Sequence, residues 1–187
     1  MEKRTSFDRF HMNAWPEPEQ LKPYFIAPKG QEWFYDQGSD GALLTIYGLN
    51  GTENLTPYKE RIDVHLSMVG NPDLGVLLIY QKFEGGFREA YSSKGDMSRT
   101  NEWVRTLHSD AMPVSLFIPF AEAWKAVKEF METDGELPKS IAWIANRDLP
   151  SNSFPAPHEI VLPGEKPPRW LSEEEAAAAI ALGQGKV

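Results

Sequence analysis

The sequence predicts an α+β domain in which an antiparallel β-sheet, built as a meander, packs against one main amphipathic helix. Between residues 42 and 91, apolar or alternating segments are separated by short turn signals, as in a series of hairpin-linked strands. An apolar stripe of helical period follows at residues 120–131. With 187 residues, 41% hydrophobic and 25% charged, the chain has the size and balance of one globular domain with extra tails.

Four segments carry the meander. The first, Ala42–Tyr47, follows a glycine-rich turn signal, and the second, Ile62–Met68, alternates apolar and polar residues like a half-buried strand. The third, Gly75–Tyr80, is apolar throughout, which is typical of a strand buried on both faces. Gly85-Gly86 then turns the chain into the fourth segment, Phe87–Tyr91, so neighbouring strands are expected to pair in sequence order.

Three further short strands are predicted outside the meander. They lie at 33–35, at 114–118, where Pro119 ends the segment, and at 139–145, where Ile141 and Trp143 share one face.

The main helix is predicted from its apolar stripe, with charged residues on the other side. Gly135 is placed to cap its end, and Pro138 prevents continuation. The stripe consists of Phe120, Ala123, Trp124, Val127, Phe130 and Met131.

Proline-rich segments flank the predicted domain, which spans residues 31–147. Residues 1–30 are expected to form an irregular Pro-rich N-terminal arm whose aromatic side chains lie on the core. Residues 148–187 are expected to form a Pro-rich C-terminal arm with a short helix from Glu173 to about Leu182. Ser172 and Glu175 have the spacing of a capping box at the start of that helix.

The sequence contains no recognisable catalytic, cofactor-binding or metal site. The absence of Cys removes disulfides, thiolate ligands and a Cys nucleophile. The phosphate-binding glycine loops, the G-x-S-x-G elbow and the H-E-x-x-H motif are also absent. His65, at a polar position of the alternating strand, is expected to be exposed or hydrogen-bonded. We therefore expect neither an enzyme nor a bound cofactor. The four His are His11, His65, His108 and His158.

Charge and hydropathy narrow the choice of partner. The formal net charge of −8 disfavours direct binding to nucleic acid, and it suits either simple solubility or a basic protein partner. No stretch approaches the roughly 18 apolar residues of a membrane helix, and residues 1–12 lack the apolar core of a signal peptide. A cytoplasmic location and no membrane association are expected.

A partner-binding surface is predicted on the hairpin and loops between Phe83 and Trp103, because they combine acidic and aromatic side chains with few demands from the core. The candidate contact residues are Glu84, Phe87, Glu89, Tyr91, Asp96 and Trp103.

The stretch from about Leu43 to Trp143 resembles the bacterial immunity-protein family paired with deaminase and related toxins of polymorphic toxin systems. Its central strand ends in a Tyr, and its helix ends in Glu-Phe before a Gly-x-x-Pro turn and a short strand with Trp. The sequence departs from the family pattern at Thr133-Asp134-Gly135, where one residue is inserted before the Gly. The resemblance is carried by Gly75–Tyr80, Tyr91–Gly95, Ile118-Pro119, Ala123, Ala126, Glu129-Phe130, Gly135, Leu137-Pro138, Ile141 and Trp143.

The resemblance implies a protein that binds a cognate toxin, blocks its active domain and needs no catalytic residue. A basic, nucleic-acid-targeting toxin such as a deaminase or nuclease is expected as the partner, since acidic side chains can replace the phosphates of its substrate. Two alternatives stay open. The chain could be an adaptor or chaperone that escorts an effector. It could also be an enzyme or small-molecule binder with a pocket lined by Tyr80, Phe87 and Tyr91.

Overall fold

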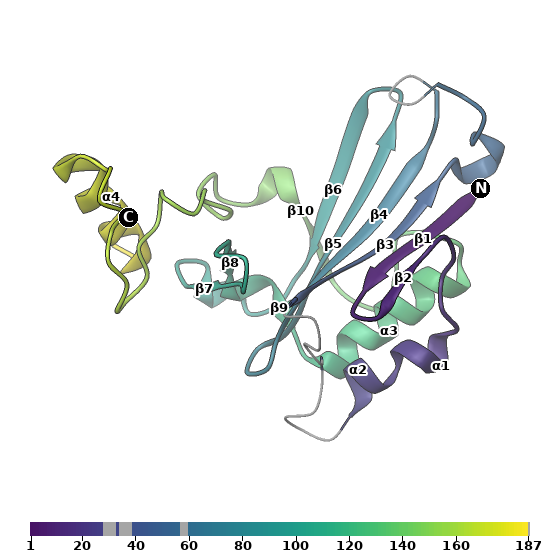
Figure 1. Cartoon of the computed structure of the whole chain (residues 1–187), viewed down its shortest axis with the longest axis horizontal. Helices are drawn as coiled ribbons and strands as arrows, with labels where there is room; N and C mark the ends of the chain where they lie inside the picture. Colours follow the sequence, from purple (N-terminus) through teal and green to yellow (C-terminus); the bar gives the residue numbers. More distant parts are fainter. Residues whose placement is uncertain (28–32, 34–38, 57–59, 187) are drawn as a thin grey trace.

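The computed structural model describes residues 1–27, 33, 39–56 and 60–186, and it confirms the α+β prediction. A mostly antiparallel sheet of eight strands has the order β10-β6-β5-β4-β3-β1-β2, with β9 pairing beside β5 (Figure 1). A second sheet contains β7 (Trp103–Arg105) and β8 (Ala111–Pro113). The strands of the main sheet are β1 (Glu2–Phe7), β2 (Phe10–Met12), β3 (Gly41–Tyr47), β4 (Asp63–Asn71), β5 (Gly75–Glu84), β6 (Phe87–Ser93), β9 (Phe117–Ile118) and β10 (Trp143–Ala145).

The meander from β3 to β6 is confirmed, with antiparallel pairing between each strand and the next. Burial alternates along β4, so Val64, Leu66 and Met68 are buried while His65 and Ser67 face the other side. The first half of β5 is buried on both faces, as its continuous apolar run predicts.

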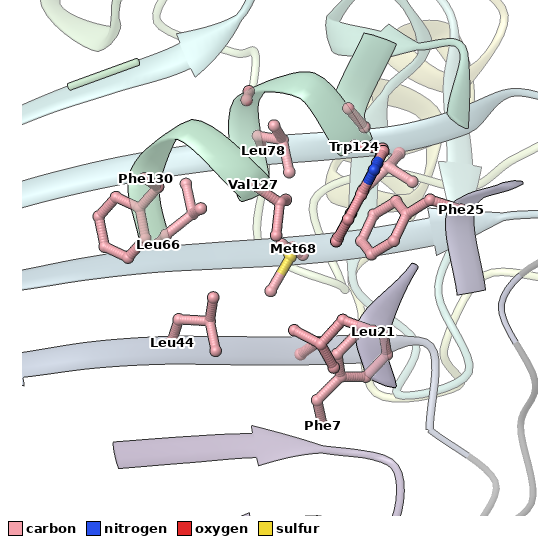
Figure 2. Packing of buried hydrophobic residues seen from close by; sticks show 14 of the residues in the cluster. Phe7, Leu21, Phe25, Leu44, Leu66, Met68, Leu78, Trp124, Val127 and Phe130 are labelled. Carbon is pink, nitrogen blue, oxygen red and sulfur yellow. The ribbon is translucent and has the colours of Figure 1, made fainter. Parts of the chain in front are cut away.

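Helix α3 (Phe120–Glu132) covers one face of the sheet and provides six of the 22 described buried residues of the main core. Its end is closed by Gly135, whose backbone N–H donates to the carbonyl of Phe130 at 2.9 Å with a positive φ of 93°. Figure 2 shows the packing of Phe7, Leu21, Phe25, Leu44, Leu66, Met68, Leu78, Trp124, Val127 and Phe130.

The N-terminal region is more ordered than the irregular arm expected for residues 1–30. Strand β1 pairs with β3, and β2 pairs with β1, so the segment extends the sheet at one edge. Short helices α1 (Pro18–Leu21) and α2 (Pro23–Ile26) follow, each with Pro in its first turn. The expectation of irregular structure is therefore wrong here, whereas the predicted packing of the aromatic residues on the core is confirmed.

Two predicted strands are shorter than expected because their backbone groups serve other partners. The segment at 114–118 begins as the 3-10 helix η3 (Val114–Leu116), and only Phe117–Ile118 pairs with β5. At 139–145, the backbone N–H groups of Lys139 and Ser140 donate to the carboxylate of Glu129, at 2.9 Å each. Strand pairing there begins only at Trp143. Of the strand predicted at 33–35, only Trp33 lies within the described residues.

The C-terminal segment packs on the β7–β8 hairpin and lies away from the main sheet (Figure 1). It ends in helix α4 (Glu173–Gly183), and the predicted capping box of Ser172 and Glu175 is present. Trp103, Ala111 and Ile160 form the small core between the two parts. The remaining 3-10 helices are η1 (Leu49–Gly51), η2 (Met97–Arg99) and η4 (Asn146–Asp148).

Candidate protein-binding site

The β5–β6 hairpin extends past the part of the sheet that α3 covers. At the level of Tyr80 and Tyr91 the strands still pack on the core, but residues 84–89 at the tip are exposed. Gly85 and Gly86 form the connection with φ values of 59° and 82°, as a two-residue turn with two left-handed positions requires. The hairpin thus presents side chains on both of its faces.

Acidic side chains gather on the face of the hairpin that continues the α3 side. Glu89 lies opposite Lys82 in the pairing of β5 with β6, and Glu84 forms an ion pair with the same Lys82. Burial raises the pKa of Tyr80 to about 12, with smaller contributions from the nearby charges of Glu89 and Glu136. Glu84 and Glu89 therefore lie beside Lys82, and Glu136 lies close enough to Tyr80 to affect it; these three carboxylates are named the acidic row.

Phe87 is the most exposed large apolar side chain among the described residues, with 81% of its surface accessible. It lies at the hairpin tip, directly opposite Glu84. A phenyl ring in water at the tip of a hairpin contributes nothing to the core, and aromatic residues, including Phe, are enriched in protein interfaces.

A pocket of about 290 Å³ opens beside Phe87, on the sheet face opposite α3. It draws residues from β3, β4, β5 and β6 and from the segment before β4, which the sheet register brings side by side. This hairpin pocket is lined by Tyr47, Arg61, Asp63, His65, Phe83, Glu84, Gly85, Gly86, Phe87 and Arg88.

Three rings lie across the pocket. The His65 ring is 5.9 Å from the Tyr47 ring and 5.0 Å from the Phe83 ring, measured between centroids. Burial lowers the pKa of His65, while the charge of Asp63 opposes this shift. Within the part of the chain that the structure describes, the buried Nε2 of His65 has no hydrogen-bond partner, so the expectation of an exposed or hydrogen-bonded ring is wrong for this atom.

The charged groups near the pocket are mostly paired within the protein. Arg61 binds the Asp63 carboxylate through Nε at 2.8 and 3.1 Å and through Nη2 at 2.8 Å. Arg61 and Arg4 both place their guanidinium groups over the Tyr47 ring, at 5.2 and 5.0 Å. Arg4 in turn pairs with Glu2 at 2.6 Å. The basic groups therefore also fix the position of an aromatic wall.

The structure brings together four of the six predicted contact residues, namely Glu84, Phe87, Glu89 and Tyr91 on the hairpin. Asp96 lies beyond the far end of β6, whose seven residues already span roughly 20 Å from the tip. Its carboxylate caps η2 by accepting from the Ser98 backbone N–H at 3.0 Å.

Trp103 is only 7% exposed, and its indole N–H donates to the carbonyl of Ser153 at 3.0 Å. The expectation that it lies at an exposed position is wrong, because the C-terminal segment covers it.

The alternative pocket of Tyr80, Phe87 and Tyr91 does not form. Tyr80 is buried against α3, and its hydroxyl donates to the carbonyl of Gly135 at 3.2 Å, so it is not available to a ligand. Phe87 contributes instead to the pocket described above.

Sequence reasoning missed Tyr47, Arg61 and His65 as pocket residues. Tyr47 and His65 place rings at outward positions of β3 and β4, where plain polar residues are usual, but the pocket forms only when the strand register aligns them. Arg61 precedes β4 and has no such signal in the sequence.

The described residues include no cluster of three or more His, Asp or Glu side chains suited to a metal ion. None of the helices in the described ranges is both long and apolar enough to cross a bilayer.

Comparison with known proteins gives one match. No curated protein and no solved structure shows significant similarity to the chain. The model of the family described as "Immunity protein Imm1" matches residues 48–145, a region that contains the whole β5–β6 hairpin. It confirms the resemblance to bacterial immunity proteins seen from Leu43 to Trp143. Because the match covers more than half of the 187 residues, the chain belongs to the Imm1 family of immunity proteins.

Proposed function

We propose that this protein binds a cognate bacterial toxin through the β5–β6 hairpin and blocks the toxin's active domain. The observation that supports this surface is the exposed Phe87 beside the acidic row, within the region that matches the immunity family. The proposed partner is a basic, nucleic-acid-targeting toxin of a polymorphic toxin system, such as a deaminase or nuclease. Neutralisation would take place in the cytoplasm of the producing cell, during competition between bacteria.

Electrostatic complementarity favours this class of partner. An enzyme that binds nucleic acid needs a positively charged cleft for the phosphate backbone. The acidic row offers carboxylates to such a cleft, and the net charge of −8 accelerates the encounter at low salt. Since blocking a cleft requires only occupancy, the proposed mechanism involves no catalysis by this chain.

The hairpin has the shape and stiffness that this role requires. It is held by the paired strands β5 and β6, its Gly85-Gly86 turn has the left-handed geometry of a tight hairpin, and the ring of Phe87 projects from the tip. A preformed projection loses little conformational entropy on binding, which favours affinity. Tyr91 lies partly buried at the base of the same face and supports the strand from the core side.

The test first identifies the cognate toxin by affinity capture from the native host at low salt, and then measures its dissociation constant with wild-type protein and with the Glu84→Gln/Glu89→Gln double variant. We expect the variant to bind at least ten times more weakly and with a smaller salt dependence, because two interfacial charges are lost. Glu173→Gln/Glu174→Gln on α4 is the matched control, with the same change in charge at another exposed place.

Two results would contradict the proposal. If wild-type protein shows no binding to the toxin domain at low salt, the partner assignment is wrong. If the toxin binds but both double variants have the wild-type affinity, the partner stands and the acidic row is not the contact surface.

A further inference from the structure

We infer that the hairpin pocket receives one aromatic side chain from the toxin, so that the toxin contacts both faces of the β5–β6 hairpin. This inference rests on the proposed function and adds the chemistry of a second contact. Basic groups of the toxin would meet the acidic row on the α3 side, and an apolar ring would enter the pocket on the opposite side.

The size and walls of the pocket fit a single side chain. Its volume of about 290 Å³ lies just below the roughly 300–1,000 Å³ that small-molecule sites usually have. The rings of Tyr47, Phe83 and Phe87 provide its apolar surface, and they allow the edge-to-face and offset contacts that aromatic pairs prefer. Interface hot spots are commonly large aromatic side chains that fill a pocket of this kind.

The charges around the pocket disfavour a cationic occupant. Asp63, which lines the pocket, is neutralised by Arg61, so its carboxylate is not free to bind a lysine or arginine of the toxin there. Arg88 also lines the pocket, and within the described ranges it forms no ion pair. A cation would therefore meet like charge here, whereas a neutral ring can stack on the guanidinium groups.

A protein partner, and not a free ligand, accounts for the exposed rim. Phe87 borders the pocket but leaves 81% of its surface in water, and a ligand inside the pocket would not cover it. A toxin surface that contacts the neighbouring acidic row would bury both Phe87 and the pocket mouth. Glu84 belongs to both sites, so the two contacts are continuous.

The walls of the pocket are also positioned before any partner binds. The bidentate Arg61–Asp63 pair and the stacking of Arg4 and Arg61 on Tyr47 fix one wall, and the pairing of β5 with β6 positions another. Preformed walls lower the entropic cost of inserting a side chain.

The first experiment needs no toxin. Wild-type protein is titrated with N-acetylphenylalanine amide, N-acetylarginine amide or N-acetylglutamate amide while the ring protons of His65 are followed by NMR. We expect a saturable shift with the phenylalanine probe alone, and its loss in the Phe83→Ala variant. The inference is overturned if the phenylalanine probe gives no saturable shift, if another probe binds more tightly, or if Phe83→Ala leaves the shift unchanged.

The second experiment uses the cognate toxin domain identified in the test of the proposed function. We expect Phe83→Ala and Tyr47→Leu each to weaken toxin binding about 30-fold, the size of an interface hot spot. Trp170→Ala is the control, since Trp170 is 69% exposed and lies in the C-terminal segment. Melting curves establish that each variant is folded, and Tyr47→Leu, which keeps an apolar side chain, serves if Phe83→Ala unfolds.

The possible outcomes distinguish a failure of the proposed function from a failure of the inference about the pocket. If the wild type fails to bind the toxin domain, the proposed function fails. If the wild type binds and the Glu84→Gln/Glu89→Gln variant is weakened, but both pocket variants keep the wild-type affinity, only the inference about the pocket fails.

Discussion

Arg105 and Glu165 are sixty residues apart in the sequence, yet the Arg105 guanidinium binds the Glu165 carboxylate through two hydrogen bonds of 2.9 Å. The same guanidinium donates to the carbonyl of Ile160 at 2.6 Å. One side chain of the β7–β8 hairpin therefore holds the C-terminal segment at two points. Few other polar contacts join these parts, so the pair is expected to control how firmly the segment is attached.

Replacing Glu165 with Gln should loosen residues 148–186 without unfolding the sheet. The pair is partly exposed, so its contribution should be about 1 kcal/mol or less. Faster amide hydrogen exchange in the C-terminal segment, with unchanged protection of β3–β6, would show this. Glu174→Gln on the exposed start of α4 is the control, and equal exchange in both variants would mean that Arg105 does not anchor the segment.

The same ion pair should respond to acid. The Arg105 guanidinium holds the pKa of Glu165 below its ordinary value. A depressed carboxyl pKa contributes stability that is present above the ordinary value and is lost as the pH falls through the lower one. On acidification, the protection factors of the C-terminal segment, which correct for the slower intrinsic exchange in acid, should therefore fall in the wild type, and Glu165→Gln should remove that response.

Two phenylalanines test the division between core and binding surface. Phe130 is fully buried between Trp15 and Tyr80, at 5.2 and 6.3 Å between ring centroids, so Phe130→Ala should cost about 3–5 kcal/mol of unfolding free energy. Phe87→Ala, in contrast, should leave the unfolding free energy within about 0.5 kcal/mol, since Phe87 is exposed. Chemical denaturation of both variants measures the contrast, and similar losses would contradict the proposed role of Phe87.

The elements that sequence patterns predict well are those whose own residues carry the signal. The stripe of α3 and the alternation of β4 are local patterns, and both elements lie where they are expected. The start of β1 has no such pattern, because Glu2, Lys3 and Arg4 are all charged. It is a strand because β3 offers an edge for pairing and because Phe7 reaches the core.

In the candidate site, too, sequence patterns predict only the parts whose residues are close together in the sequence. The hairpin was found because Gly85-Gly86 marks its turn, and the acidic residues beside it lie close together in the sequence. The pocket joins Tyr47 to Phe83 across three strands, and no local pattern encodes that contact. Trp103 was misplaced for a related reason, since the residues that bury it come from a segment some fifty positions later.

Tyr80 should make the protein sensitive to alkali. Its pKa of about 12 is raised chiefly by burial, above the ordinary value near 10. A raised pKa gives stability that is complete below the ordinary value and is lost as the pH rises through the higher one. The Tyr80 hydroxyl also loses its donor role toward Gly135 on ionisation. Unfolding free energy should fall above pH ~10, by at most about 3 kcal/mol. Tyr80→Phe should show a smaller fall, and an equal fall in both proteins would contradict this account.

His65, in contrast, should make the protein sensitive to acid. Burial lowers its pKa, and the neighbouring groups on the same face include Asp63 and Arg61, which pair with each other, and the uncharged Thr45 and Gln81 on the adjoining strands. The folded state therefore favours the neutral ring, so the associated stability is present above the ordinary value near 6.5 and is lost as the pH falls through the lower one.

This prediction is checked by following the His65 ring protons by NMR and the unfolding free energy between about pH 7 and pH 5. The His65→Gln variant should lose less stability on acidification than the wild type, whereas a variant of the exposed His108, His108→Gln, should behave like the wild type.

Protonation of His65 also places a positive charge beside the Tyr47 and Phe83 rings. An aromatic probe in the hairpin pocket, which keeps the ring from water, should then bind less well as the pH falls. A His65 that titrates at or above the ordinary value would mean that the ring is solvated, and the dry aromatic wall required for that binding mode would not exist.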